Sequence, residues 1–318
     1  MAAPTNTATT LVSAGNREDL EDVIWRVAPE ETPFSANIGK AKATGIYHEW
    51  QTESLASPDA TNAQLEGDDI ASLDAPNLTS RLGNYNQIFR KTAGVSRTQE
   101  IVDKAGRESE LDRQKVLKGI ELRRDAEKRF IGNFASNAES GSTPRRTGGL
   151  LAFLTSNASR GAGGSGGGFS GGVVAAATNG TQRTFTEALV KGVLATCFNN
   201  GGRPTQAYMG STHKQAFSAF TGIAEIRRDA PGQAMATIIG AADIYVSDFG
   251  NLALIPHAYG LTRDCVLVDP DMAAIATLDG IKTTPLGKSG DADKVMITME
   301  KCLVVKNEKA HGVIADLT

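Results

Sequence analysis

The amino-acid sequence predicts an α+β fold with segments that protrude from the folded body. One long helical pattern runs from Ser109 to Asn137 without a proline. Helix-like and strand-like segments follow it in irregular order, without the strict alternation of a doubly wound fold. An acidic stretch at 53–77 contains no aromatic residue. Because it cannot bury much apolar area, it must stay disordered or become ordered against a partner.

The composition is that of a folded protein with one elaborate domain or two ordinary ones. The 318 residues are 40% hydrophobic and 22% charged, but only 6% are aromatic and 34 are glycine. The net charge of −3 is unevenly distributed, since residues 1–100 hold 8 basic and 14 acidic side chains and residues 101–160 hold 12 and 8. This asymmetry favours pairing within or between chains. It is not a nucleic-acid footprint, because the basic residues alternate with acids.

The first hundred residues predict an arm, a short helix and two extended segments. Residues 1–16 are small and polar, and a helical pattern at 17–25 ends before two prolines. Strand-like patterns cover 45–51 and 78–97. The acidic stretch 53–77 lies between them, so it is either disordered or the long tip of a hairpin.

The helical pattern at 109–137 begins with a good cap, Ser109, and has acids in its first turn. Its apolar side consists of Val116, Ile120, Phe130, Ile131 and Phe134, with Leu117 at the edge. Arg123, Arg124 and Glu127 occupy the same side in the middle turns. The pattern therefore predicts buried ends and a charged centre.

Oppositely charged neighbours three or four residues apart predict ion pairs along this helix. The expected pairs are Asp112 with Lys115, Lys118 with Glu121, Arg123 with Glu127, and Asp125 with Arg129. Such a helix is either the solvated surface of a monomer or a strut that meets neighbouring chains. The long acidic stretch favours the second interpretation.

The second half predicts a flexible glycine loop at 161–172, then a mixed domain. Thr184 and Glu187 form a capping-box pattern for a helix that ends at 199–202. The buried stripe expected for that helix is Phe185, Leu189, Val193 and Cys197. A short helix is expected at 211–220, and strands at 206–209, 234–247, 252–256, 264–269 and 295–305.

Motifs of catalysis or cofactor binding are not supported by their context. The glycine tract formally contains G-x-G-x-x-G and G-x-S-x-G, but without the strand, turn and helix that each motif needs. The Gly-Lys-Ser at 287–289 lacks the first glycine of a phosphate loop. No nucleophile, base and oxyanion set can be assembled. We therefore predict a protein that is not an enzyme and has no cofactor.

Metal and disulfide frameworks are also not expected. The histidines, His48, His213, His257 and His311, have no helical-spaced partner, and the acid pairs Asp68 with Asp69 and Asp291 with Asp293 do not follow a calcium-loop pattern. Three widely spaced cysteines fit a reducing compartment. No signal-peptide or membrane-spanning pattern is present, which predicts a cytosolic protein or one assembled in the cytosol.

Three stretches carry a family resemblance. RVAPEETPFSANIG at 26–39, YHEWQTESLA at 47–56 and NEKAHGVIADL at 307–317 resemble segments of major head proteins of tailed bacteriophages with the Hong Kong 97 capsid fold. The order of arm, acidic extended segment, long helix, mixed domain and late strand is similar as well. The resemblance spans about residues 17–317, although the glycine tract has no counterpart that can be aligned.

The resemblance implies an architecture and a function. Its parts would be an N-terminal arm at 1–44, an extended hairpin at 45–97, a peripheral domain at 98–183 with a spine helix at 107–137, an axial domain at 184–290, and a closing strand at 291–318 that returns to the peripheral domain. Hexamers and pentamers of this subunit would form an icosahedral head that encloses DNA without reading its sequence. The virion would be assembled in the bacterial cytoplasm, with no membrane contact.

The resemblance also implies partners. A portal and a separate scaffolding protein are expected, since the arm is too short to be an internal scaffold, and a decoration protein is possible. Some proteins of this fold join subunits through a lysine on the extended hairpin, but residues 43–90 contain no lysine. Two alternatives stay open: a nanocompartment shell of the same fold that encloses an enzyme, and a soluble enzyme that binds a nucleotide at the glycine loop.

Complementary charge is the expected guide of assembly. Acids of the hairpin would meet basic residues of a neighbour, with the spine helix as one candidate for their location. The candidate assembly residues are Trp50, Glu66, Asp68, Asp69, Arg90, Arg113, Arg123, Arg124 and Arg129.

Overall fold

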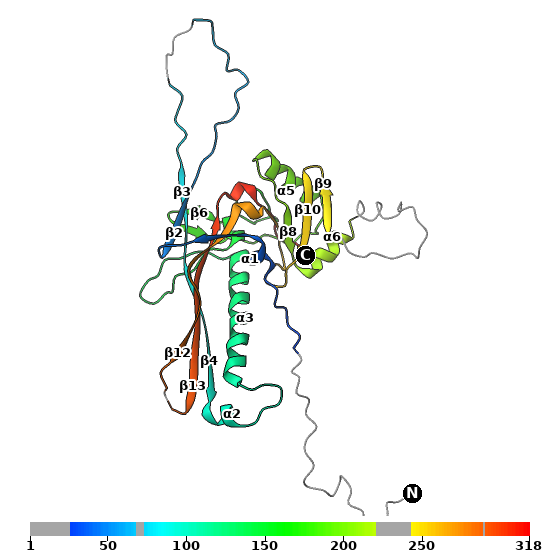
Figure 1. Ribbon diagram of the computed structural model, residues 1–318. Coiled ribbons are helices and arrows are strands. Elements are labelled where there is room, and N and C mark those ends of the chain that lie inside the picture. Colours follow the sequence, from blue (N-terminus) through cyan, green and yellow to red (C-terminus); the bar gives the residue numbers. More distant parts are fainter. Residues whose placement is uncertain (1–25, 68–72, 221–242, 289) are drawn as a thin grey trace, which may run out of the picture.

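The computed structural model describes residues 26–67, 73–220, 243–288 and 290–318. The helix expected at 17–25, Asp68, Asp69 and the first part of the strand expected at 234–247 lie outside the described residues. Figure 1 shows an elongated body with two parts: a long helix beside a sheet of long strands, and a second sheet flanked by shorter helices. A long loop projects from one end of a two-stranded hairpin.

The first sheet has four strands in the order β1-β12-β13-β4, with β1 at Gly39–Lys42, β4 at Gln87–Ser96, β12 at Ala273–Leu286 and β13 at Ala292–Val305. β1 runs parallel to β12, and the other neighbours are antiparallel. The long helix α3, Glu110–Ile131, lies against β4 and β13. Strands from opposite ends of the chain therefore form one support for this helix.

The second sheet has six strands in the order β5-β14-β11-β8-β10-β9. Its strands are β5 Ala158–Ser159, β8 Gln206–Met209, β9 Ile244–Ser247, β10 Gly250–Pro256, β11 Cys265–Val268 and β14 Gly312–Ile314. Two helices accompany it, α5 at Glu187–Asn199 and α6 at Ser211–Ser218. The last strand, β14, brings the end of the chain into this sheet beside β11.

Shorter elements connect these parts. The hairpin strands are β2 Tyr47–Thr52 and β3 Ser80–Tyr85, and a second small hairpin is made by β6 Gly168–Ser170 and β7 Val173–Ala175. The short helices are α1 Pro33–Asn37, α2 Arg97–Ile101, α4 Leu150–Phe153, and the 3-10 turns Pro270–Met272 and Glu308–Ala310. Within the described residues, no helix is both long and apolar enough to cross a membrane.

The core is divided by the second sheet. Tyr208 and Val266 on β8 and β11 face one hydrophobic cluster, which contains the buried residues of α3 and α4. Their strand neighbours Ala207 and Leu267 face another cluster, which contains the buried residues of α5 and α6. Because side chains alternate along a strand, one sheet supplies both cores and joins the two parts of the body.

The long helix differs from the sequence pattern in its end and in its faces. Ser109 caps it as predicted, accepting the backbone N–H of Asp112 at 3.1 Å, but the helix ends at Ile131 rather than near Asn137. Gly149 packs against the last carbonyls, since a Cβ there would lie 2.1 Å from the oxygen of Gly132. The helix cannot continue because this crossing segment occupies its path.

The middle turns of α3 are buried, contrary to the prediction. Leu122, Ala126 and Glu127 are buried, whereas Val116 is 64% exposed. The ion pairs Asp112 with Lys115 and Lys118 with Glu121 are present. The other two predicted pairs are wrong: Glu127 accepts hydrogen bonds from α1, and Asp125 pairs with Lys91 at 2.7 Å. Contacts with distant segments override the spacing along the helix in both cases.

One strand prediction needs correction, and two strands of the first sheet were not predicted. The segment 78–97 is two strands, separated at Asn86, whose buried side chain donates to the carbonyl of Gly45 at 2.6 Å. The strands β1 and β12 have no counterpart among the predicted elements. The pairing of β12 with β13 includes register shifts between Thr277 and Lys282.

The glycine tract is not the flexible loop that the sequence predicts. It contains β6, and its Gly161 N–H donates to the buried carboxylate of Asp316 at 3.0 Å. A Cβ at Gly167 would lie 1.9 Å from the carbonyl oxygen of Ala175. The glycines therefore permit close packing of backbone segments.

The helix α5 begins later than the capping-box pattern at Thr184 and Glu187 predicted. Thr186, rather than Thr184, precedes it, and no side chain caps it. Glu187 accepts a hydrogen bond from the hydroxyl of Tyr245 at 3.0 Å. The buried residues of α5 are Val190, Val193, Leu194 and Cys197, while Phe185 is buried before the helix and Leu189 only packs against the cluster.

Candidate assembly surfaces

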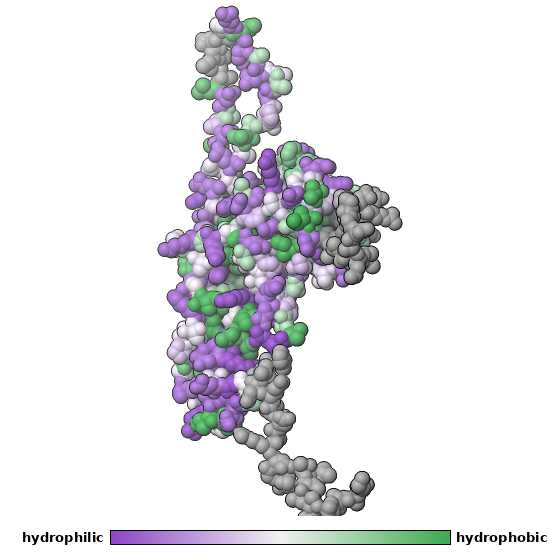
Figure 2. All heavy atoms as spheres, turned by 45° about the vertical axis from the view of Figure 1, so that its right-hand side comes forward, coloured by the Kyte–Doolittle hydropathy of each residue, from purple (hydrophilic) through white to green (hydrophobic). Residues whose placement is uncertain are grey.

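The loop between β2 and β3 makes up residues 53–79 and contains six acidic and no basic residues. The hairpin is in register from Tyr47 opposite Tyr85 to Thr52 opposite Ser80, and beyond that point every described loop residue is exposed. Figure 2 shows hydrophobic residues distributed among hydrophilic ones along the projecting loop. Its four leucines, Leu55, Leu65, Leu73 and Leu78, are 79–88% exposed.

Such exposure is costly for a free loop. Burying a leucine side chain contributes about 1.5–3 kcal/mol. Four leucines held away from the body therefore mark the loop as a surface for another molecule. Glu66 lies among them, exposed beside Leu65.

Trp50 belongs to the base of the hairpin. Its ring is half-buried, 6.2 Å from the ring of Phe153, and packs against the core. Asn84 on the facing strand is fully buried, and its side chain donates to the carbonyl of Leu303 at 2.8 Å. These contacts hold the hairpin base against the body, so the loop projects from a rigid support.

The end of the N-terminal arm is held by one buried carboxylate. The two oxygens of Glu127 accept the backbone N–H groups of Phe34 and Ser35 at 2.7 and 2.9 Å, and the Ser35 hydroxyl donates to the second oxygen. Nε2 of His257 lies 3.1 Å from the first oxygen. Because Nδ1 of His257 accepts the N–H of Tyr259, Nε2 carries the ring proton and donates to Glu127. One side chain thus joins the arm, α3 and the segment after β10.

Most predicted basic residues already have a partner in their own chain. Arg129 donates to the carbonyls of Thr147 and Ala135 at 2.7 and 2.6 Å, and burial lowers its pKa to about 10. The guanidinium of Arg124 stacks over the ring of Tyr259, 5.4 Å from its centroid. Arg113 forms an ion pair with Glu110 at 3.1 Å.

Arg90 and Arg123 differ from these three. Both are exposed, and neither forms an ion pair with another described residue. Arg123 lines a cavity between α1, α3 and the four-stranded sheet, together with Lys40 and Lys301. Neither lysine can be identified from the sequence, because nothing local relates β1, α3 and β13.

Other large apolar side chains are exposed at two further places. One group lies on α2 and the residue after it and on the exposed second half of β12: Ile101, Val102, Ile281 and Leu286. The other lies on the outer strands of the six-stranded sheet and the end of α5: Phe198, Ile244, Val246 and Phe249. In Figure 1, α2 lies at the end of the body opposite the projecting loop. The body therefore has apolar surface at both of its parts.

The cysteines and two buried histidines, which are residue types that often act in catalysis or metal binding, lie in the packed interior of this fold. Burial raises the pKa of the thiols of Cys197, Cys265 and Cys302 to about 12 and lowers the pKa of His311 to about 4. His213 is buried near the carbonyl of Thr262 at 3.2 Å. Among the residues described, no group of three or more histidine, cysteine or acidic side chains could hold a metal ion.

A projecting loop with exposed leucines and apolar surface on both parts of the body are features of a protein that contacts other molecules. The family model for the SU10 major capsid protein matches residues 3–318, so the chain belongs to this family. It is therefore one of the structural proteins of phage heads.

A curated relative agrees with the family. The chain is 33% identical over 121 residues to the major capsid protein of Escherichia phage Phieco32. This match covers 38% of the chain and spans only about a third, 34%, of the relative's length.

Solved structures agree in fold. The capsid of cyanophage A-1(L) matches with a TM-score of 0.65 at 12% identity over 98% of both chains, and a chain from Mycobacterium phage Adephagia with a TM-score of 0.62 at 11% identity over 98% of both. A chain from a structure of phage G major capsid and decoration proteins matches with a TM-score of 0.56 at 11% identity over the full length of both chains. The α+β fold of Hong Kong 97 type, predicted from the sequence, is thus confirmed. None of these matches favours a nanocompartment or a nucleotide-binding enzyme.

Proposed function

We propose that copies of this chain assemble into the hexamers and pentamers of an icosahedral head that encloses the DNA genome. The observation that carries this proposal is the loop 53–79, which exposes four leucines and six acids away from its own body. In a single copy the leucines of this loop stay exposed, whereas in a ring of copies each loop can be covered by a neighbour. The role is structural and requires no catalysis or cofactor.

Expression of the chain in bacteria, followed by negative-stain electron microscopy and sedimentation, tests this proposal. Closed shells or capsomers support it. A monomer that stays monomeric at high concentration and with a coexpressed scaffold would contradict it.

We assign the parts of the subunit as the resemblance implies. Residues 1–44 act as the arm, 45–97 as the extended hairpin, and 98–183 as the peripheral domain around α3. Residues 184–290 form the axial domain that closes capsomers, and 291–318 form the closing strand that returns to the peripheral domain. The pairing of β12 with β13 joins the last two parts to the peripheral sheet, and β14 joins the end of the chain to the six-stranded sheet. This supports a body that moves as one unit during assembly.

Further partners complete the head in this proposal. A portal occupies one vertex, and a separate scaffolding protein guides closure. The shell forms in the bacterial cytoplasm without contact with a membrane. A decoration protein is compatible with the fold, since the similar structure from phage G includes decoration proteins. DNA is enclosed without sequence-specific contacts.

We expect the subunits to be joined without covalent cross-links. The hairpin segment 43–90 contains no lysine that could form an isopeptide bond with a neighbour. Purified particles boiled in detergent should therefore give a single band of monomer size on a denaturing gel. A ladder of multimers under reducing conditions would contradict this prediction.

Neutralising the acids at the loop tip should impair assembly. In the variant Glu66→Gln, Asp68→Asn, Asp69→Asn, the loop loses half of its six charges while its leucines remain. We expect particle yield in micrographs to fall by about three- to tenfold, because complementary charge guides association. The matched control Asp103→Asn, Glu108→Gln, Asp112→Asn removes as much charge from the region around α2 and the start of α3. Equal yields of the two variants would show that the tip acids have no specific role.

A further inference from the structure

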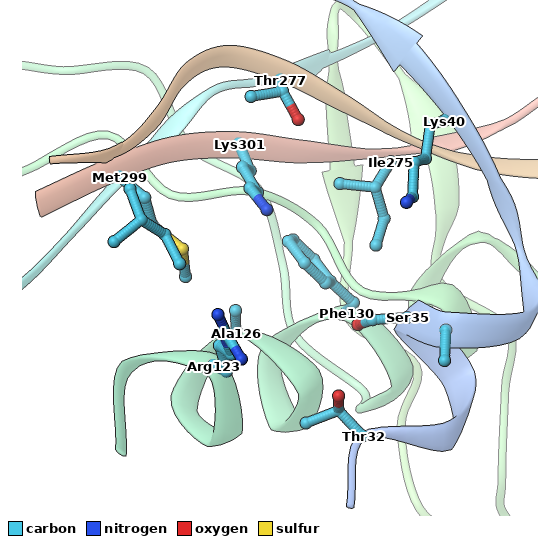
Figure 3. A pocket seen from close by; sticks show the side chains of 12 residues that line it. Thr32, Ser35, Lys40, Arg123, Ala126, Phe130, Ile275, Thr277, Met299 and Lys301 are labelled. Carbon is cyan, nitrogen blue, oxygen red and sulfur yellow. The ribbon is translucent and has the colours of Figure 1, made fainter. Parts of the chain in front are cut away.

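A cavity of about 270 Å³ opens between α1, α3 and the four-stranded sheet, and three cationic side chains converge on it. Lys40 comes from β1, Arg123 from α3 and Lys301 from β13 (Figure 3). Among the described residues that line the cavity, none is acidic. The cations also have no ion-pair partner within the described chain, in contrast to Arg113 and Lys118 on the same helix.

The three charges repel one another. The pKa of the Lys301 ammonium is lowered, first by burial and then by the charges of Arg123 and Lys40. A single anion in the cavity would relieve this repulsion and would interact with all three cations in a partly desolvated site. The hydroxyl groups of Thr32 and Thr277, at the same cavity, add hydrogen-bonding capacity.

The floor of the cavity is apolar. Phe130, Ile275 and Met299 are buried side chains that line it. A hydrated inorganic anion would leave this floor uncovered. A carboxylate next to an aliphatic side chain fits both features, since the carboxylate faces the cations and the aliphatic group covers the floor.

The loop of the hairpin presents such a combination. Leu65 and Glu66 are consecutive, and both are exposed. Glu66 occupies a turn with Gly67, which has a φ of 83°, and Leu65 directly precedes this turn. In its own chain the loop points away from α3 (Figure 1), so the donor must be another copy.

We propose that this cavity is the receptor for Leu65 and Glu66 from the loop of a second copy of the chain. The inference rests on the proposed shell function and identifies the residues at one of its contacts. Glu66 faces Lys40, Arg123 and Lys301, and Leu65 covers the apolar floor. Each subunit gives one loop and receives one, so the contact repeats around a capsomer.

A charge exchange tests the contact. In the variant Lys40→Glu, Arg123→Glu both substituted side chains are exposed, so the subunit should fold, and we expect particle yield to fall by tenfold or more. Adding Glu66→Lys should restore at least a third of the wild-type yield. Lys128→Glu reverses one charge at an exposed position on the same helix that does not line the cavity; this control should assemble like wild type, and each single variant of the pair should assemble less well than it does.

The outcomes separate this inference from the proposed function. Wild-type protein without shells would refute the proposed function. Wild-type shells with an unaffected Lys40→Glu, Arg123→Glu variant would refute only the receptor. Rescue by Asp74→Lys instead of Glu66→Lys would overturn the assignment of Glu66. If the Lys40→Glu, Arg123→Glu variant gave a normal particle yield but its shells held less DNA, the cavity would be assigned to phosphate binding. That result would overturn the proposal.

Cross-linking gives a second, direct measurement. Cys197, Cys265 and Cys302 are buried, so introduced surface cysteines can be targeted alone. Particles of Glu66→Cys, Arg123→Cys treated with a short bismaleimide should give a ladder of multimers on a denaturing gel. The control pair Glu66→Cys, Lys128→Cys should stay monomeric. A ladder from the control pair without one from the test pair would overturn the proposal.

Discussion

Replacing residues 53–79 by an Asn-Gly turn is expected to leave the subunit folded and to abolish shell assembly. Thr52 and Ser80 are directly opposite each other in the hairpin, so a two-residue turn can close the strands without changing their register. All described loop residues are exposed, and the loop forms no part of the hydrophobic clusters. Its loss should therefore change the melting temperature of the monomer very little.

The expected effect on assembly is large. The four leucines can contribute about 1.5–3 kcal/mol each when buried on a neighbour, before the cost of ordering the loop. Each factor of ten in an association constant corresponds to about 1.4 kcal/mol. We therefore expect no particles by sedimentation or microscopy. A control loop of equal length built from glycine and serine should also fail, since it restores the span without the leucines and acids. Normal shells from either variant would refute the role of the loop.

The sequence predicted those features that depend on neighbours in the chain. Ser109 caps α3 because its acceptor and the N–H that it satisfies are three residues apart. The exposed loop was predictable from composition, since a run of acids without aromatic residues has little to bury. The strand β13 follows from its alternating apolar residues.

Features that depend on distant segments were missed. The outer half of β12 is exposed and contains Gly280 and Pro285, so it has no alternating pattern, and it forms a strand because β13 pairs with it. Glu127 was assigned to the charged surface because Arg123 lies four residues away. Its actual donors, Phe34 and Ser35, are 93 and 92 residues away in the sequence.

The candidate site shows the same division. Glu66 and Arg123 could be selected from charge and helical position alone. Lys40 and Lys301 could not, because their proximity to Arg123 arises only when β1, β13 and α3 pack together. Conversely, Arg129 has the charge expected of an interface residue but donates to two carbonyls of its own chain. Sequence patterns identify charges, whereas packing decides which charges lack a partner.

Glu127→Ala is expected to cause the largest loss of stability of any single substitution considered. The carboxylate is fully buried and accepts hydrogen bonds from two backbone N–H groups, the Ser35 hydroxyl and His257. Its removal leaves these buried donors without an acceptor and opens a cavity beside α1. We expect the free energy of unfolding to fall by about 3–5 kcal/mol and the melting temperature by about 10 °C.

The exposed carboxylate of Asp125 on the same helix provides the control. It pairs with Lys91 at 2.7 Å and is half exposed, so Asp125→Ala should cost about 1 kcal/mol or less. Release of the arm can be followed separately, because β1 holds Lys40 and Lys42 in the sheet beside β12. Trypsin should cut after these lysines faster in Glu127→Ala than in the wild type or in Asp125→Ala. Equal melting temperatures for the two alanine variants would mean that the arm is held by β1 and its apolar contacts, and not by the carboxylate.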